Sequence, residues 1–296
     1  MFELKSYLKQ KNQIIDASLE KMIQDSQSSE TLVKAMKYSL MAGGKRIRPV
    51  LCLAACEAVG GVPQDALATA CALEMIHTYS LIHDDLPAMD DDEIRRGKAT
   101  NHIAFDEPTA ILACDALLTL AFEVISSVDF EDGNQAAQRL QVIRLISEAA
   151  GYQGMIQGQM LDIVSEGNKL SAAELQTMHR LKTGALIETS LACGALLAGA
   201  DCRQTDLLKD YARKIGLAFQ VADDILNVEG NPELMGKAVG TDSQREKNTY
   251  PSVLGIQASR EFSRKLVQEA LQALETFDKQ ADPLRGIARY IIERER

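Results

Sequence analysis

Six carboxylates lie within ten residues of this chain, from Asp84 to Glu93, and no lysine or arginine follows before Arg95. Two unit charges ~4 Å apart interact by about 4 kcal/mol at an effective dielectric of about 20. The run is therefore either solvated, as an ordinary acidic surface stretch is, or it binds a cation. Apolar residues precede it, and Leu86 and Met89 lie within it, so we expect the acids to project from a buried helix. Oxygen donors without a neighbouring cysteine favour a hard cation, and Mg²⁺ is favoured because the calcium-loop pattern is absent.

A second pair of acids, Asp223 and Asp224, lies in a stretch that is otherwise largely apolar. Gln220, Asp224 and Asn227 fall within about 60° of one another on a helical wheel, with Asp223 beside them. Buried carboxylates need polar partners, so these side chains should face an internal polar site. The two acidic stretches then suggest two walls of one cavity.

Basic residues recur beside glycines. In residues 43–49, two glycines precede Lys45, Arg46 and Arg48. Such cations complement a helix C-terminus or form a solvated turn, but three together also suit an anion cradle. Further basic residues lie at other glycine-marked positions: Arg95, Arg96, Lys182, Lys237 and Lys247. Carboxylates and phosphates are both anions, so a site with Mg²⁺, carboxylates and several Lys or Arg is what a diphosphate requires.

His77 lies seven residues, or two helical turns, before Asp84 and therefore on the same helix face. A lone histidine on an apolar helix is commonly a core residue, but this alignment also suits a ligand contact. Gln159 and Asp162 are three apart on one helix face, where they are expected to cap or bridge structure, or to approach a ligand. Lys-Thr-Gly at 182–184 carries no specific signal alone, because no strand leads into it.

The composition predicts a helical protein. Of 296 residues, 46% are hydrophobic and 5% aromatic, and tryptophan is absent, which suits packed aliphatic helices. The formal net charge of −10 argues against general binding of nucleic acid or of an anionic membrane. The six cysteines show no zinc-type spacing, and with no signal peptide they predict buried thiols in a reducing cytoplasm. No apolar run is long enough for stable membrane insertion.

Helical periodicity and chain breakers predict one all-α domain over residues 1–296. The expected helices are residues 4–24, 31–42, 64–85, 111–127, 138–160, 171–198 with a break at 182–184, 205–229, and helices in 252–296 broken near 282–283. Ser171 and Glu174 form a capping-box pattern, and Pro87 should bend or end the helix beside the acids. Arg95-Arg96-Gly97 is interpreted as another helix end with a glycine stop.

Four motifs then stand in a fixed order: Gly-Gly-Lys-Arg-x-Arg-Pro at 43–49, Ser-Leu-Ile-His-Asp-Asp-Leu-Pro-Ala-Met-Asp-Asp-Asp with Arg-Arg-Gly at 80–97, Lys-Thr-Gly at 182–184, and Phe-Gln-Val-x-Asp-Asp-Ile-Leu at 219–226. Together they resemble the trans-isoprenyl diphosphate synthase family, and bacterial farnesyl diphosphate synthases are the most similar members. The resemblance implies an all-α isoprenoid synthase fold, in which a single large helical bundle surrounds a central cavity. It also implies a homodimer.

The resemblance implies roles for individual residues. The expected ligands of Mg²⁺, at three ions per site and with Mn²⁺ as a substitute, are Asp84, Asp85, Asp90, Asp223 and Asp224. The allylic diphosphate is expected at Arg95, Lys182, Thr183, Gln220 and Lys237, with Lys247 nearby. The homoallylic isopentenyl diphosphate is expected at Lys45, Arg48, His77 and Arg96. The expected catalytic residues are Asp84, Asp90, Asp223 and Lys182.

The implied activity is condensation of isopentenyl diphosphate with dimethylallyl or geranyl diphosphate to give farnesyl diphosphate. Tyr79, an aromatic residue five before the first Asp, its neighbour Ser80 and the Pro87-Ala88 pair match the pattern that accompanies a fifteen-carbon product. Helical spacing puts Tyr79 about 140° from the first Asp, so its place at the cavity floor follows from the resemblance alone. Asn227 departs from the family's second motif, which usually closes with Asp. We expect altered metal affinity there but continued activity.

Three other functions stay open. A geranylgeranyl diphosphate synthase, with a twenty-carbon product, is the first alternative, because opposing helices also shape the cavity floor. A catalytically silent subunit of a hetero-oligomeric prenyl synthase should have lost the acids or the basic positions, most of which this chain retains. A class I terpene cyclase should have one aspartate-rich motif and no isopentenyl pocket, whereas Lys45, Arg48 and a second Asp pair are present.

Overall fold

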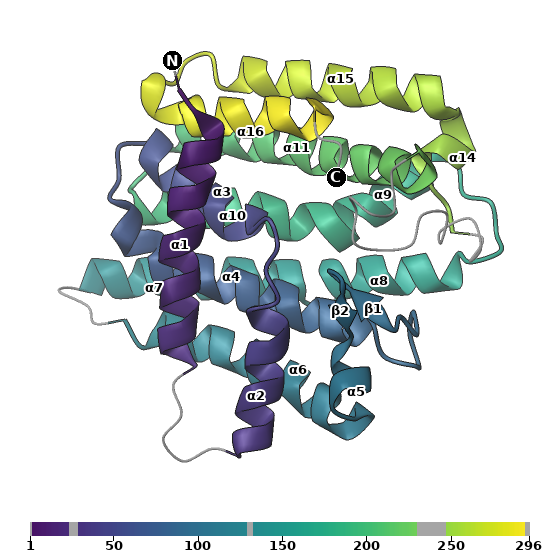
Figure 1. The fold of residues 1–296 in the computed structure, drawn as a ribbon. Helices are drawn as coiled ribbons and strands as arrows, with labels where there is room; N and C mark the ends of the chain where they lie inside the picture. The colour runs from purple at the N-terminus through teal and green to yellow at the C-terminus, as the bar shows by residue number, and fades with distance from the viewer. Residues whose placement is uncertain (1, 24–28, 129–132, 230–246, 294–296) are drawn as a thin grey trace.

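The structure, a computed structural model, describes residues 2–23, 29–128, 133–229 and 247–293. Within these ranges the chain is helical apart from one short hairpin (Figure 1). The first half contains α1 (Leu4–Met22), α2 (Glu30–Leu40), α3 (Ile47–Ala58), α4 (Pro63–Asp84), β1 (Ile94–Arg95), β2 (Lys98–Ala99), α5 (Asn101–Ala104), α6 (Glu107–Ser126) and α7 (Gly133–Ala150). The second half contains α8 (Met155–Val164), α9 (Ala172–His179), η1 (Arg180–Gly184), α10 (Ala185–Leu197), α11 (Cys202–Glu229), α14 (Tyr250–Leu254), α15 (Ile256–Ala273), η2 (Lys279–Ala281) and α16 (Asp282–Glu293). The prediction of an all-α fold is confirmed.

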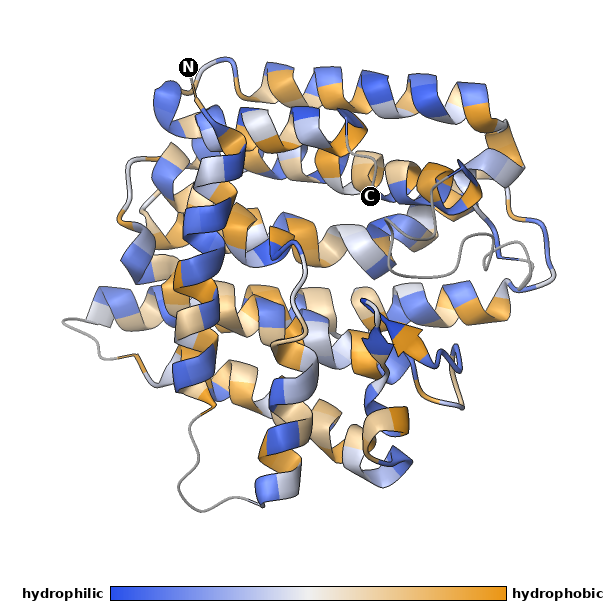
Figure 2. Ribbon diagram, in the orientation of Figure 1, coloured by the Kyte–Doolittle hydropathy of each residue, from blue (hydrophilic) through white to orange (hydrophobic). Residues whose placement is uncertain are grey.

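The helix α4 runs through the middle of the bundle, packed against α3, α6 and α10. Its buried residues occur on every side of the helix, as its continuous apolar content predicts. The outer helices differ: α15 shows alternating hydrophilic and hydrophobic bands in Figure 2, because only one face meets the core. A single cluster of buried apolar side chains extends from Ile15 to Ile291 and joins both halves of the chain.

The ends of α4 are set by proline. Pro63 occupies the first turn, where its missing N–H costs nothing. The helix ends at Asp84, three residues before Pro87, as predicted. The chain then folds back, because the Asp90 N–H donates to the carbonyl of Asp84 at 2.8 Å and the Asp91 N–H donates to that of Leu86 at 3.1 Å. The loop thereby returns the second half of the acidic run to the end of α4.

The prediction of a helix end at residues 95–97 is wrong. Arg96 and Gly97 instead form the two-residue turn of a β-hairpin, in which Arg95 pairs with Lys98 and Ile94 with Ala99. Both turn residues have positive φ, 54° and 73°, as a primed hairpin turn requires.

The helix predicted over residues 138–160 is interrupted. α7 ends at Ala150 and α8 begins at Met155, and two glycines, Gly151 and Gly154, lie in the break. A Cβ on Gly154 would lie 2.1 Å from the carbonyl oxygen of Ala149, so a larger residue does not fit there. The break near residues 282–283 lies earlier than predicted, in residues 274–281, and α16 starts at Asp282.

The interruption predicted at residues 182–184 is a π-helical turn. α9 begins at the capping box of Ser171 and Glu174, as the sequence predicts. It passes into η1, which spans Arg180–Gly184, and continues as α10. A π-helical turn adds a residue to the helical turn and changes the direction of its side chains, and such turns are frequent at functional sites.

Candidate active site

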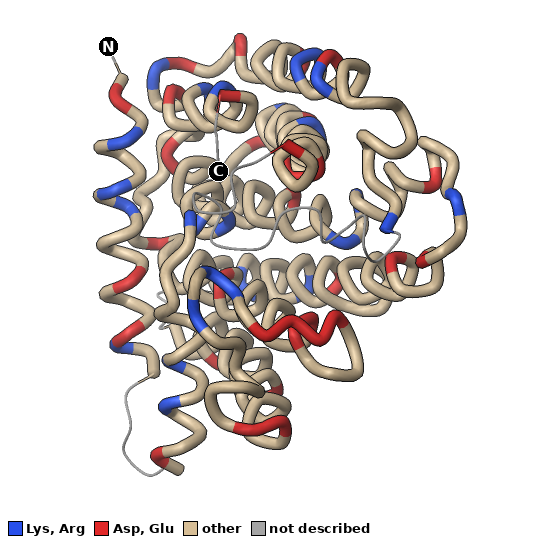
Figure 3. The backbone as a smooth tube through the Cα atoms, turned by 45° about the vertical axis from the view of Figure 1, so that its right-hand side comes forward, with Lys and Arg blue, Asp and Glu red and all other residues tan. Residues whose placement is uncertain are grey.

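A cavity of about 840 Å³ opens between α4, the hairpin, α6, α8, η1 and α11. It brings together twelve of the residues that the sequence singled out. These are Lys45, Arg48, His77, Tyr79, Ser80, Asp84, Arg95, Arg96, Lys182, Thr183, Gln220 and Asp223. Lys237 lies outside the described residues. Figure 3 shows that Asp and Glu occupy consecutive segments of one loop, with segments of Lys and Arg close by.

One face of α4 supplies a stripe of cavity residues: Glu74, His77, Leu81 and Asp84, spaced three, four and three apart. This spacing keeps all four on one side of the helix. Burial lowers the pKa of His77 well below its usual value, and Arg48 and Arg96 lower it further. The His77 ring is therefore neutral and offers one donor and one acceptor to a ligand.

Asp84 is the last residue of this stripe, and Asp90 lies beside it in the loop that follows α4. Burial raises the pKa of Asp84; among the neighbouring charges, Lys182 lowers it and Asp90 raises it again. A carboxylate in this situation gains from a divalent cation, which would favour its charged form.

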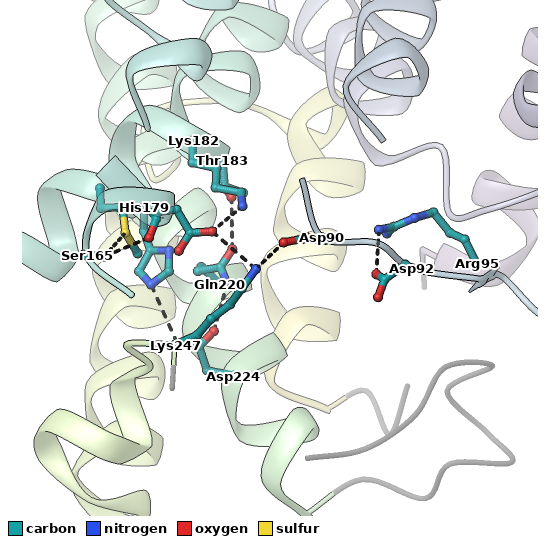
Figure 4. Close-up of polar contacts among 12 residues, drawn as sticks. Asp90, Asp92, Arg95, Ser165, His179, Lys182, Thr183, Gln220, Asp224 and Lys247 are labelled. Carbon is teal, nitrogen blue, oxygen red and sulfur yellow. Dashed lines mark hydrogen bonds and ion pairs between the residues drawn. The ribbon is translucent and has the colours of Figure 1, made fainter. Parts of the chain in front are cut away.

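A chain of ion pairs lies beside Asp84. It runs from Lys182 to Asp162, then to Lys247 and on to Asp90. The Lys182 Nζ lies 2.6 Å from Oδ2 of Asp162, and the Lys247 Nζ lies 3.7 Å from the same oxygen. Lys247 also donates to Oδ1 of Asp90 at 2.9 Å (Figure 4). Burial acts to raise the pKa of Asp162, but the lysines outweigh it, so that this pKa lies below its usual value. Asp162 thus holds two cations close together.

A chain of hydrogen bonds runs from η1 into α11. The Thr183 hydroxyl donates to Oε1 of Gln220 at 3.0 Å, and Nε2 of Gln220 donates to Oδ1 of Asp224 at 2.8 Å. The N–H of Tyr250 donates to the other oxygen of Asp224 at 2.9 Å. Both oxygens of this buried carboxylate are therefore engaged by protein donors. Asp223, one residue earlier, lines the cavity instead.

Asp85 also faces away from the cavity. Its carboxylate is 3% exposed and accepts a hydrogen bond of 2.6 Å from Nε of Arg95. Burial raises the pKa of Asp85 to about 7, although Arg95 acts in the opposite direction. Arg95 reaches Asp92 as well, at 3.4 Å (Figure 4). In this arrangement Asp85 positions Arg95, and its predicted role as a metal ligand stays a prediction.

Lys45, Arg48 and Arg96 form a basic part of the same cavity wall. Burial lowers the pKa of Arg48 to about 10, and Arg96 contributes to this by repulsion. Among the described residues, the buried Nε of Arg48 has no hydrogen-bond partner. Arg96 donates to the carbonyl of Gly43, and the Lys45 ammonium lies 5.8 Å from the ring centroid of Phe219. Closely spaced cations, with an Nε–H of Arg48 that no described residue accepts, form a site for a multiply charged anion.

Gly44 leaves room for the Arg96 guanidinium beside its backbone, so replacing Gly44 should weaken the basic part of the site. Its φ is +127°, and a Cβ there would lie 2.7 Å from the Arg96 guanidinium carbon. We expect Gly44→Ala to destabilise the fold by roughly 1–3 kcal/mol through backbone strain and to displace Arg96. Gly199→Ala is the matched control, because Gly199 also has positive φ but no atom within 4 Å of its Cβ position, and it does not line the cavity. Both variants should lower Tm, and only Gly44→Ala should reduce anion binding measured by calorimetry.

Three residues of the site were missed or undervalued in the sequence. Gln159 lines the cavity, and neither polar atom of its buried amide has a hydrogen-bond partner in the part of the chain that the structure describes. Asp162 bridges the two lysines. Glu74 lies one turn before His77 on the cavity face of α4. Spacing to His77 was an available signal for Glu74, whereas Gln159 and Asp162 were related only to each other.

The acidic residues form an oxygen donor set that suits Mg²⁺. Asp84 and Asp90 are joined through the loop backbone, and Asp223 lines the same cavity. No three His, Cys, Asp or Glu side chains converge on one point among the described residues. A cation here would therefore take few protein ligands, and water and substrate oxygens would complete its shell, as is usual for Mg²⁺.

Comparison with known proteins identifies the family of this site. The polyprenyl synthetase family model matches residues 29–285. A dimethylallyltranstransferase of Fischerella ambigua is 50% identical, with coverage of 99% of this chain and 84% of the relative. A farnesyl diphosphate synthase of Geobacillus stearothermophilus is 44% identical (99% and 98%), and a geranylgeranyl diphosphate synthase of Cyanophora paradoxa is 46% identical (99% and 97%).

Solved structures agree with the helical architecture. The apo crystal structure of an FPP/GFPP synthase from Zymomonas mobilis superimposes with a TM-score of 0.86 at 38% identity, and the match covers 98% of each chain. The arrangement of helices around the cavity is therefore the isoprenoid synthase fold that the sequence motifs imply.

Proposed function

Because the chain belongs to the polyprenyl synthetase family and is a prenyltransferase, we propose that it condenses isopentenyl diphosphate with dimethylallyl or geranyl diphosphate. The product is farnesyl diphosphate, and the reaction depends on Mg²⁺. One observation carries this proposal: a single cavity is lined both by the carboxylates Asp84 and Asp223 with Lys182 and by a second set of polar residues, Arg48, His77 and Arg96. Two anionic head groups can therefore bind side by side with an apolar space between the helices.

Each group of side chains has a defined task in this reaction. Arg95, Lys182, Thr183 and Gln220 bind the allylic diphosphate, and Lys45, Arg48, His77 and Arg96 bind isopentenyl diphosphate. Asp84, Asp90 and Asp223 would hold Mg²⁺, which when bound neutralises charge that develops on the departing diphosphate. Lys182 and Lys247, fixed by Asp162, offer preorganised positive charge in the same place.

The allylic C–O bond then breaks, and the electron pair leaves with the diphosphate. The double bond of isopentenyl diphosphate attacks the cation, which forms a bond between C1 and C4, and one proton is lost. No cavity side chain is an evident base, because His77 is surrounded by arginines. The released diphosphate is the proposed proton acceptor. Leu118, Met155 and Phe219 line the cavity and keep water from the cation.

The test is product analysis. Purified protein is incubated with Mg²⁺, isopentenyl diphosphate and either dimethylallyl or geranyl diphosphate, and the products are separated by chain length. A fifteen-carbon product supports the proposal, and its loss on addition of a chelator supports the metal requirement. A twenty-carbon product would favour a geranylgeranyl diphosphate synthase, the function printed for the relative that is 46% identical. No condensation at all would favour a silent subunit or a cyclase.

We further propose a homodimer, which α6 supports. Among the described helices, α6 alone is long and apolar enough to cross a membrane, yet only 33% of its most apolar stretch is buried. Large apolar side chains are also exposed at Leu112 of α6 itself, at Leu140 of α7 and at Val164 of α8. A second copy would cover this face. We expect sedimentation to give twice the chain mass of 32.4 kDa without detergent; a monomer at micromolar concentration would contradict the dimer.

A cytoplasmic location is part of the same proposal. All six cysteines are free thiols, and five of them are buried. Such thiols persist where the compartment is reducing.

A further inference from the structure

Glu74 is a buried carboxylate that the reaction above does not use. It lies on the cavity face of α4, one turn before His77. Its Oε1 accepts a hydrogen bond of 2.8 Å from Nη1 of Arg46, and each of the two side chains is only 1% exposed. Its Oε2 has no hydrogen-bond partner among the residues that the structure describes.

Arg46 joins Glu74 to two other parts of the fold. Its Nε donates to Asp16 of α1 at 3.0 Å, and its Nη2 donates to the carbonyl of Leu40 at the end of α2 at 2.6 Å. Its backbone has a φ of 49°, which is left-handed and unusual for a residue with a side chain. The surrounding contacts must therefore over-determine this conformation for it to persist.

This conformation decides where the neighbouring cations point. Arg46 is only 3% exposed, and it contributes to the cavity wall together with Lys45 before it and Arg48 after it. A change in the Arg46 backbone would move both of them. Glu74 also lies within electrostatic range of Arg48 and Arg96: burial lowers the pKa of each, and Glu74 acts against that effect. One carboxylate thus offsets the mutual repulsion of three guanidinium groups.

We do not expect the buried Glu74–Arg46 ion pair to be present only for stability. The desolvation of two buried charges commonly cancels their attraction, so apolar residues of similar volume would stabilise the fold as well or better. The geometry instead points to Glu74 as a positioning residue: through Arg46, and by offsetting Arg48 and Arg96, it holds the cations that receive the homoallylic diphosphate. This inference rests on the proposed function, because it assigns that diphosphate to these cations.

The variant Glu74→Gln tests the inference, since it keeps the size and an acceptor for Arg46 but removes the charge. We expect KM for isopentenyl diphosphate to rise by about tenfold, because misplaced binding groups lose much of their effect. The KM for the allylic diphosphate should change less than about twofold, and kcat at saturation less than about threefold, because Asp84, Asp223 and Lys182 are untouched. Glu74→Asp, which keeps the charge, should restore part of the loss.

Glu57→Gln is the matched control. Glu57 of α3 forms an ion pair with the buried Lys11 of α1 and accepts from the Tyr7 hydroxyl, and it does not line the cavity. Both Gln variants should lower Tm, but only Glu74→Gln should change KM. If Glu74→Gln behaves like Glu57→Gln, the pair is structural and the inference is wrong. A lower KM for isopentenyl diphosphate would also overturn the inference, because Glu74 would then act only by repelling the anionic substrate.

Calorimetry separates this inference from the function on which it rests. Titration of each protein with isopentenyl diphosphate measures binding without turnover. If the unmodified protein neither condenses nor binds isopentenyl diphosphate, the proposed function has failed. If the unmodified protein is active and Glu74→Gln binds as tightly as it does, the function stands and the inference has failed.

Discussion

Replacing Asp84 with Asn should lower kcat by about 10³-fold, equivalent to about 4 kcal/mol of transition-state stabilisation. Asp84 lines the cavity at the end of α4, and the Asp90 N–H is hydrogen bonded to its backbone carbonyl at 2.8 Å. The variant keeps its shape but loses the negative charge that would hold Mg²⁺ against the departing diphosphate. The measurement is steady-state turnover at saturating concentrations of both substrates.

This loss should not come from unfolding. A carboxylate at the C-terminus of a helix is unfavourable to the helix dipole, and burial raises the pKa of Asp84. Asp84→Asn should therefore leave Tm unchanged or raise it. Asp91→Asn makes the same chemical change in the same acidic run at an exposed position, where Asn tolerates the φ of 50°. Activity of Asp84→Asn equal to that of Asp91→Asn would refute the catalytic assignment.

Replacing Tyr79 with Ala should lengthen the product from the proposed fifteen carbons to twenty or more. Tyr79 is 4% exposed, projects from α4 and lines the cavity with Ser80 and Leu118. Its ring packs at 6.0 Å against that of His83. Removal of the phenol ring leaves space into which a growing hydrocarbon chain extends. The measurement is the product distribution after incubation with excess isopentenyl diphosphate.

Tyr79→Phe separates ring volume from hydroxyl chemistry. The Tyr79 hydroxyl is buried and has no hydrogen-bond partner among the described residues, so Phe should stabilise the fold slightly or leave it unchanged. We expect its product to be that of the unmodified protein. An unchanged product from Tyr79→Ala would place the cavity floor at other residues and leave the chain-length assignment to opposing helices.

The sequence was most informative where residues on one helix act together. His77 and Asp84 share a face of α4 because seven residues make two turns, and both line the cavity. Adjacent acids were harder to assign, since neighbours on a helix point about 100° apart. In each pair only one acid lines the cavity. The side chain of Asp85 meets Arg95, and that of Asp224 meets Gln220 and Tyr250.

Features that depend on distant partners could not be predicted. The role of Asp162 requires Lys182, twenty residues away, and Lys247, which is further still. A glycine after basic residues is typical both of a helix end and of a hairpin turn, because both structures need a residue with positive φ there. The sequence therefore predicts a helix end at residues 95–97, where the structure has a hairpin. Only pairing between Ile94 and Ala99 distinguishes them.

The contact between Lys247 and Asp90 has a consequence for how the protein folds. The two residues are 157 positions apart in the chain. Closing a loop of that length costs about 4–5 kcal/mol of chain entropy, whereas a pair of this kind contributes far less. The contact cannot draw the two halves together and forms only after the helices between them have docked. We therefore expect that, during refolding, ligand binding recovers no earlier than helical circular dichroism.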